Sequence, residues 1–558
     1  MSETTPVPRI KALSLAIGMA LLVTACTEEA NTSSTGPAAP AASSSMASTP
    51  STPAEQSTTP SLGIRPNGDT EREIDMSLVH SEDLRNVYAY IDENIDQHVQ
   101  NLQRWIQQPS ISNTGEGIQE SAYMVEGFFD QLGCQETQVY DVGITEWGQQ
   151  GNPVVYANCD EGAEKTMVVY WMYDTMPVTQ PDLWTSPPFE GRLVEQAPYP
   201  KVLIGRGATN SKGGQMAFWN AMMSIKAVTG SLPVNLIFVA EGDEERMSIG
   251  YRKFVRDHPE LFTEADVMWG YGASEGCVFV ELITSGESWG RGPTYSNIHG
   301  GRKRAVDAPA WRHIQMLSTL VDETGNRVMI DGFYDDIEPL TAEEEAVLRR
   351  SAEDYDVELA AENLGVARFI SDDPYEVRKM SRYGTSMNLD GIWGGNMFEG
   401  GSGAILPNRI VSKHNFRYVP NQDGLKIVDL LRVHLDEHGY EDVEINIVGD
   451  VPWAKMSYEN DLAYAIDDMQ VIFGGSPDEP VQHPSILGGY WPAYLFAGDV
   501  LDIPIASGMV GGGGNAHAAN EYFVIEGAGN TFGMAGMEKS VATVLFEYAG
   551  LNEPPAED

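Results

Sequence analysis

The chain has 558 residues, of which 42% are hydrophobic and 9% aromatic, and its 81 acidic side chains outnumber 35 basic ones. This length exceeds what one hydrophobic core supports, so the sequence predicts two or more domains and excludes fibrous and fully disordered classes. The net charge of −46 repels phosphate backbones, so we expect no nucleic acid partner. A solvated acidic surface explains this charge most simply, and a saline habitat is the alternative.

The N-terminus resembles an export signal. Arg9 and Lys11 precede the apolar run 12–25, which is too short for a membrane-spanning helix. The tetrapeptide ending at Cys26 resembles a bacterial lipobox, which predicts a lipoprotein signal peptide over 1–26 and an acylated Cys26. An ordinary cleaved signal is the alternative. In the first case the mature protein is anchored in the outer membrane by its lipid and faces the periplasm or the cell surface.

Residues 27–78 are rich in Ser, Thr, Pro and Ala, and this composition cannot offset the entropy of ordering. We therefore predict a disordered tether between the lipid and the folded body. Three cysteines follow it: Cys134, Cys159 and Cys277. Because three is an odd number, the sequence predicts no disulfide framework.

From 79 to 286, strand-like and helix-like segments alternate. Residues 81–107 and 214–228 have helical character, whereas 166–171 and 234–240 are short apolar runs typical of buried strands. This alternation predicts an α/β fold with a mostly parallel sheet, and places active-site residues at the carboxyl ends of its strands.

The second half of the chain divides in two. Residues 287–447 mix helical segments with alternating strands and predict an inserted α+β domain. Residues 448–553 return to strands and a glycine-rich loop, so we expect them to complete the first domain.

Five segments occur in a fixed order along these regions: WMYDTMP at 171–177, GRGATNSKG at 205–213, EGDEE at 241–245, FRYVPNQ at 416–422 and HAANE at 517–521. Together they resemble the M20 metallopeptidases, particularly the carnosinase-like dipeptidase branch, over about residues 82–550. The resemblance implies a zinc-exopeptidase-like catalytic domain with an inserted lid that makes a homodimer. It also implies that metal-bound water, activated by a glutamate, attacks an amide bond.

Four of the family's site positions carry suitable side chains in this sequence. Glu244 takes the position of the general base, and Glu245 and His517 take positions of metal ligands. Asp174 takes the position of the carboxylate that we expect to orient His517.

Three other metal-ligand positions have changed. Asn210 replaces the bridging aspartate, Met172 replaces the first histidine, and Gly272 replaces a later acid. An amide is a weak ligand and a thioether suits zinc poorly, so a pair of dications loses much of its attraction. We predict at most one divalent ion, zinc, on Glu245, His517 and Asn210. A metal-free site is the alternative.

The residues that we expect to contact the substrate also differ from those of the family. Tyr295 replaces the lid histidine that faces the oxyanion across the dimer, and His299 could substitute for it. Arg417, accompanied by Asn388, is the candidate for binding a substrate carboxylate, although Arg417 could instead pair with an acid of the lid. We expect the pocket to be lined further by Tyr490, Glu521, Lys212, Ser274 and Glu275.

Residues 272–276 match the Gly-x-Ser-x-Gly nucleophile elbow, but a strand rather than a helix is expected to follow, which argues against a serine hydrolase. The sequence thus predicts a hydrolase of amide or peptide bonds in small peptide-like or N-acyl substrates that carry a carboxylate. The alternative is a metal-free relative that binds such ligands without hydrolysis, or that uses metal-independent acid–base chemistry.

Overall fold

The computed structural model describes residues 61–353, 355–456, 459–475, 485–486, 488–498 and 500–554. The predicted signal peptide at 1–26 and the first part of the predicted tether, 27–60, lie outside these residues. None of the described helices is both long and apolar enough to cross a membrane.

The remainder of the predicted tether, 61–78, is not free of the folded body. The carboxylate of Asp96 accepts hydrogen bonds from the backbone N–H groups of Leu62 and Ile64, at 2.8 and 2.9 Å. Arg65 pairs with Glu526 at 2.8 Å, and β1 (Asp69–Thr70) pairs with β18 (Ala528–Gly529). The tether prediction was therefore wrong from 61 onward, because specific polar contacts compensate for the weakly apolar composition.

The catalytic domain is built on a six-stranded sheet in the order β15-β8-β4-β7-β3-β2. The first four strands are parallel, and only β3 runs antiparallel to its two neighbours β7 and β2, which confirms the mostly parallel sheet. The strands are β15 (Ile505–Ala506), β8 (Val267–Trp269), β4 (Thr166–Met172), β7 (Asn235–Glu241), β3 (Val154–Cys159) and β2 (Glu136–Tyr140).

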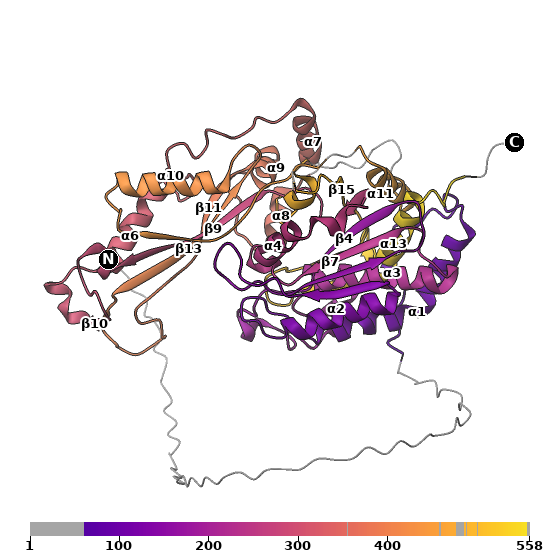
Figure 1. Cartoon of the computed structure of the whole chain (residues 1–558), viewed down its shortest axis with the longest axis horizontal. Coiled ribbons are helices and arrows are strands. Elements are labelled where there is room, and N and C mark those ends of the chain that lie inside the picture. The colour runs from indigo at the N-terminus through magenta and orange to yellow at the C-terminus, as the bar shows by residue number, and fades with distance from the viewer. Residues whose placement is uncertain are drawn as a thin grey trace, which may run out of the picture. The chain divides into compact units, whose positions relative to one another are not determined.

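Alternate residues of the central strands pack into two different cores. Along β4, Val169 and Trp171 join the core under helices α1, α2, α3 and α13. Tyr170 and Met172 join the opposite core, beneath α4. Figure 1 shows α1, α2 and α3 along one face of β4 and β7. The helices are α1 (Glu82–Ile106), α2 (Ile118–Leu132), α3 (Gly213–Thr229), α4 (Ile249–Asp257), α11 (Asp461–Ile472), α12 (Tyr494–Ala497) and α13 (Met534–Tyr548).

A four-stranded antiparallel sheet, β16-β17-β6-β5, flanks the site. Its strands are β5 (Arg192–Gln196), β6 (Tyr199–Ile204), β16 (Gly513–Gly514) and β17 (Tyr522–Glu526). β6 leads into the 205–213 turn and the loop between β16 and β17 contains His517, so this pairing brings two of the sequence motifs together.

The lid is a second antiparallel sheet, in the order β11-β13-β9-β14. It comprises β9 (Gly276–Ser285), β11 (Ser386–Trp393), β13 (Arg409–Tyr418) and β14 (Glu444–Val451), with α6 (Pro309–Leu320) and α10 (Gly424–Glu437) packed on one face. The predicted boundaries at 286/287 and 447/448 therefore need correction, because cross-strand pairing places all of β9 and β14 in the lid. Helices α7 (Ala342–Glu353), α8 (Val357–Leu364) and α9 (Pro374–Tyr383) complete this region.

Cys134 and Cys159 form a disulfide, so the prediction of no disulfide was wrong. Cys134 follows α2, and Cys159 ends β3, on which α2 packs. The odd count arose because the third thiol, Cys277, is buried and free in the lid sheet.

A buried polar chain crosses the lid between α6 and the sheet. His313 Nδ1 lies 2.8 Å from Thr284 Oγ1, and its Nε2 lies 2.8 Å from Ser412 Oγ. Ser412 Oγ in turn lies 2.8 Å from His414 Nε2. Burial lowers the pKa of both His313 and His414 from 6.5 to about 4.

These histidines should make the lid acid-sensitive. The unfolded chain takes up protons near pH 6.5 that the folded lid accepts only near pH 4, so stability falls as the pH decreases through this window. In thermal melts between pH 7 and 4, His313→Gln combined with His414→Gln should flatten the decline in Tm. Parallel curves for the variant and the wild type would contradict this assignment.

Candidate functional site

Three side chains that are distant in the sequence meet at the carboxyl edge of the main sheet. Glu245 Oε1 lies 2.9 Å from His517 Nε2 and 2.9 Å from Asn210 Nδ2. Asn210 Nδ2 also lies 3.0 Å from His517 Nε2. We call Asn210, Glu245 and His517 the polar triad. It consists of the three residues that the sequence predicted as metal ligands.

The His517 side chain is 52% exposed, whereas that of Glu245 is 4% exposed. The hydrogen bond to Glu245 raises the pKa of His517. Solvent or a substrate can therefore reach the triad from the histidine side.

Asp174 fixes the turn that contains both glutamates. It is fully buried two residues beyond the end of β4, and it accepts hydrogen bonds from the backbone N–H groups of Glu244 and Glu245, at 3.2 and 3.1 Å. Burial, followed by repulsion from Glu245, raises the pKa of Asp174 to about 8. The expected contact with His517 is not formed, because the parallel neighbour β7 brings the 244–246 turn to this carboxylate instead.

Glu244 lies beside the triad and is half-buried. Burial, followed by the neighbouring charge of Glu245, raises its pKa well above the ordinary value, and Arg417 opposes the shift. A carboxylate with a raised pKa is a stronger base, so Glu244 suits the general-base role that its sequence position predicts.

Glu521 anchors the turn that carries Asn210. It pairs with Arg206 Nη1 at 2.7 Å, and both side chains are 1% exposed. Glu521 also accepts hydrogen bonds from the backbone N–H groups of Gly207, Thr209 and Asn210, at 2.9–3.0 Å. Its carboxylate is thus fully used inside the protein, which corrects the prediction that it binds substrate.

Lys212 and Ser274 also have structural roles rather than the predicted contact with substrate. Lys212 is fully buried, and its Nζ donates to the carbonyls of Trp105 and Gln108, at 3.1 and 2.8 Å. Burial lowers the pKa of Lys212 to about 7. Ser274 Oγ accepts from the Trp491 N–H at 3.0 Å, and strand β9 follows two residues later, so no nucleophile elbow forms.

At the positions where the family's metal ligands are missing, the residues of this chain take part in packing instead. Met172 is buried in the same core as Tyr170 and Trp491, whose rings lie 5.0 Å apart. Trp491 Nε1 donates to the Gly272 carbonyl at 2.8 Å. Within the described residues, no group of three or more His, Cys, Asp or Glu side chains is placed to hold an ion. Two dications do not fit here, whereas the carboxylate and imidazole of the triad are suitable donors for one.

Arg417 is paired, as the alternative interpretation of the sequence allowed. Its Nη1 lies 2.9 Å from Glu275 Oε1, and its guanidinium lies 4.6 Å from the Tyr490 ring centroid. Asn388 bonds to Asp390 on its own strand at 2.8 Å. Arg417 and Glu275 therefore largely neutralise each other at the lid edge.

Tyr295 and His299 lie on the lid surface, away from the triad in this chain. The Tyr295 side chain is among the most open, at 95% exposure. His299 is exposed and its Nδ1 accepts from the Gly301 N–H at 3.1 Å. Neither has a contact with Glu244 or the triad among the described residues, so a catalytic role requires a second chain.

A cavity of about 440 Å³ opens beside Glu245 toward the lid, and Phe279, Lys413 and Tyr490 also line it. Lys413 forms no ion pair with any described residue. Lys413 is not among the predicted site residues, although alternation along β13 places it on the same face as Asn415 and Arg417.

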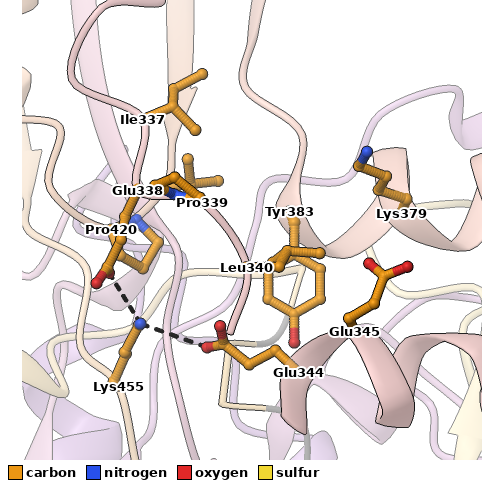
Figure 2. Close-up of a pocket in the computed structure, with 11 residues that line it drawn as sticks. Ile337, Glu338, Pro339, Leu340, Glu344, Glu345, Lys379, Tyr383, Pro420 and Lys455 are labelled. Atoms are coloured by element: carbon orange, nitrogen blue, oxygen red, sulfur yellow. Dashed lines mark hydrogen bonds and ion pairs between the residues drawn. The ribbon is translucent and has the colours of Figure 1, made fainter. Parts of the chain in front are cut away.

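A separate cavity of about 400 Å³ in the lid is less suited to catalysis. Figure 2 shows Lys455 between Glu338 and Glu344, at 2.9 and 3.3 Å. These charges satisfy one another, and we assign no site there.

A mostly parallel sheet with an inserted lid and a polar triad at the sheet edge is the arrangement of an exopeptidase-type hydrolase scaffold. The family model described as peptidase family M20/M25/M40 matches residues 172–531. The chain belongs to this family.

Several relatives are similar over most of their length. A Cys-Gly metallodipeptidase of Candida albicans is 26% identical, covering 78% of this chain and 93% of the relative. A Beta-Ala-His dipeptidase of Rattus norvegicus is 27% identical, covering 72% and 85%. The crystal structure of an M20 metallo-carboxypeptidase from Sulfolobus solfataricus has a TM-score of 0.67 at 28% identity, covering 82% and 99%.

Replacing Glu521 should destabilise the whole site. Glu521→Gln leaves Arg206 buried without a compensating charge, and we expect the free energy of unfolding to fall by about 3 kcal/mol. Denaturant unfolding measures this loss, with Glu93→Gln on the exposed face of α1 as the control. Equal stabilities of the two variants would show that Glu521 is not the anchor.

Proposed function

We propose that this chain hydrolyses the amide bond of small, peptide-like or N-acyl substrates that carry a carboxylate, with at most one divalent ion on the triad. The observation that carries the proposal is the polar triad beside Glu244 in a chain of peptidase family M20/M25/M40. The dipeptidase names of the relatives support a dipeptide-sized substrate.

In this proposal, different residues accept the proton and bind the ion. Glu244 accepts the proton of the attacking water, since its raised pKa makes it basic. Glu245 and His517 would hold the ion, zinc in the first instance, with Asn210 as a weaker ligand. When bound, the ion would polarise the water and the amide carbonyl.

In this proposal, the cavity beside Glu245 orients the substrate. Lys413 lines that cavity without an ion pair among the described residues, so it is free to bind a carboxylate. Arg417 is less suitable than the sequence suggested because Glu275 already neutralises it.

A metal-free relative is the second candidate, and one observation favours it. Glu245 Oε1 accepts hydrogen bonds from Asn210 Nδ2 and His517 Nε2, both at 2.9 Å, so the carboxylate is satisfied by the other two members of the triad without an ion. Such a chain would bind peptide-like ligands without hydrolysis, or use Glu244 in metal-independent chemistry.

We also propose where the enzyme is located and that it forms a homodimer. We propose that it is exported as an outer-membrane lipoprotein, as the predicted N-terminal signal suggests, and the Cys134–Cys159 disulfide suits an oxidising compartment. A homodimer would bring the exposed Tyr295 or His299 of one chain to the triad of the other.

Metal analysis combined with turnover tests the proposal. Purified protein incubated with zinc should retain at most one ion per chain by mass spectrometry, and chelation should abolish dipeptide hydrolysis. Glu244→Gln should lower kcat roughly a hundredfold to ten-thousandfold with unchanged metal content, whereas His517→Gln should lose the ion. Two retained ions would refute the single-ion site. Full turnover after chelation would support the metal-free candidate.

Replacing Lys413 should affect binding more than chemistry. Lys413→Met should raise KM for a dipeptide about tenfold, because a charge-assisted hydrogen bond to its carboxylate is lost. KM for the same dipeptide with an amidated C-terminus should not change. Lys253→Met, on the outer surface of α4, is the matched control. An equal effect on both substrates would place the carboxylate elsewhere.

A further inference from the structure

Asn520 connects the loop that carries His517 to a second loop of the chain. Its Oδ1 accepts hydrogen bonds from the backbone N–H and the hydroxyl of Thr185, at 2.7 and 2.9 Å. Its Nδ2 donates to the carbonyl of Leu183, at 3.0 Å. One amide side chain therefore uses both of its ends to bind a segment that lies 335 residues earlier in the sequence.

The loop that carries His517 has few hydrogen bonds of its own. Asn515, His517 and Asn520 all have left-handed backbone conformations, with φ of 58°, 62° and 57°. Such conformations are uncommon for residues other than glycine. Within residues 515–520, all of which the structure describes, the single backbone–backbone hydrogen bond runs from the Ala518 N–H to the Asn515 carbonyl, at 3.0 Å. The position of the imidazole therefore depends on contacts with other parts of the chain.

The second loop has a buried support. It comprises the short helix η1 (Pro181–Leu183) and the two residues that follow. The ring of Trp184 lies 5.4 Å from the guanidinium carbon of Arg206, as in a cation–π contact. Arg206 is 1% exposed and is paired with Glu521, the anchor of the neighbouring turn. The second loop is thus held against the same buried ion pair that supports the site.

We propose that Asn520 is a positioning residue, which holds His517 at Glu245 by binding the loop around Thr185. Sequence position predicted this orienting role for Asp174, whose carboxylate binds the turn of Glu245 instead. The loop that Asn520 binds continues the chain beyond Asp174. One segment then supports two members of the triad, since Asp174 holds the turn of Glu245 and Thr185 holds the loop of His517.

This role predicts an effect on ion binding, and in that respect the inference rests on the proposed function. A histidine that is already oriented loses less conformational freedom when it binds an ion. Partners that orient metal-binding histidines contribute roughly ten- to hundredfold to the affinity for the ion. Asn520 acts through the backbone of its loop and does not contact the ion itself.

Asn520→Gly removes the three hydrogen bonds and keeps a residue that tolerates φ of 57°. In competition with a chromophoric chelator, the zinc affinity of the full-length variant should fall roughly tenfold or more. Asn421→Gly in the lid is the matched control, because Asn421 has φ of 73° and donates to the Asp336 carbonyl at 2.8 Å. Its zinc affinity should equal that of the wild type.

Thr185→Val tests the other side of the contact without changing the loop of His517. It removes the hydroxyl that donates to Asn520 Oδ1, and should weaken zinc binding about threefold. The double variant Thr185→Val, Asn520→Gly should bind zinc as weakly as Asn520→Gly alone, since both changes remove the same contact. Additive losses would show that the two residues act independently, and would overturn the proposal.

Hydrogen–deuterium exchange of the metal-free protein provides a readout that needs neither ion nor substrate. In Asn520→Gly, the amides of Thr185 and Ala518 should exchange faster, because the first loses its acceptor and the second lies in the released loop. The amides of Gly207 and Thr209, which bond to a different carboxylate, should be unchanged. Melting temperatures confirm that the variants fold.

Unchanged zinc affinity in Asn520→Gly would overturn the positioning role, and faster exchange would then show only a structural one. Equal losses of affinity in Asn520→Gly and Asn421→Gly would do the same. If the wild type binds no zinc, the single-ion site of the proposed function fails, and crystals of metal-free Asn520→Gly decide the inference. His517 displaced from Glu245 would support the positioning role, whereas an unchanged distance of 2.9 Å would refute it.

Discussion

Two buried carboxylates, one accepting two backbone N–H groups and the other three, hold the candidate site in its geometry. Asp174 binds the turn of Glu244 and Glu245, and Glu521 binds the turn of Asn210. Hydrogen bonds from N–H groups to a carboxylate are strong and directional, so each turn has little freedom. The polar triad and the general base are thereby held on rigid supports at the edge of the parallel sheet.

This arrangement concentrates acid groups, and their repulsion has to be offset. Burial and mutual repulsion raise the pKa of Asp174 and Glu244, while Arg206 and Arg417 oppose the build-up of negative charge. A pair of metal ions would have supplied that compensation in full. In this chain the positions of the lost ligands hold Met172 and Gly272, in an apolar layer closed by Trp491. The site therefore offers fewer acid ligands than a pair of dications needs, which is why we propose at most one ion.

Hydrophobic periodicity made much of the fold predictable. The helix expected over 81–107 is α1, capped by Ser81, and the apolar runs at 166–171 and 234–240 are β4 and β7. Strand pairing was harder to predict from the sequence, because β9 and β14 join the lid through pairing between residues that are far apart in the chain. The ordered contacts of 61–78 were missed for a related reason. They depend on single long-range polar pairs, such as Arg65 with Glu526, that composition does not reveal.

For the site, motif positions predicted which residues meet but not which way each side chain points. Glu245, His517 and Asn210 converge as expected, whereas Lys212 and Glu521 of the same motifs turn inward to satisfy backbone groups. A motif fixes backbone position, and burial then decides whether a charged side chain supports the loop or faces the substrate. The same reasoning makes Lys413, which belongs to none of the five motifs, the better candidate for an anion contact than Arg417, because Arg417 is already paired with Glu275. Glu281 is its cross-strand partner and lines the same cavity, but no ion pair to Lys413 occurs among the described residues, so in our proposal it binds a ligand without first breaking an ion pair.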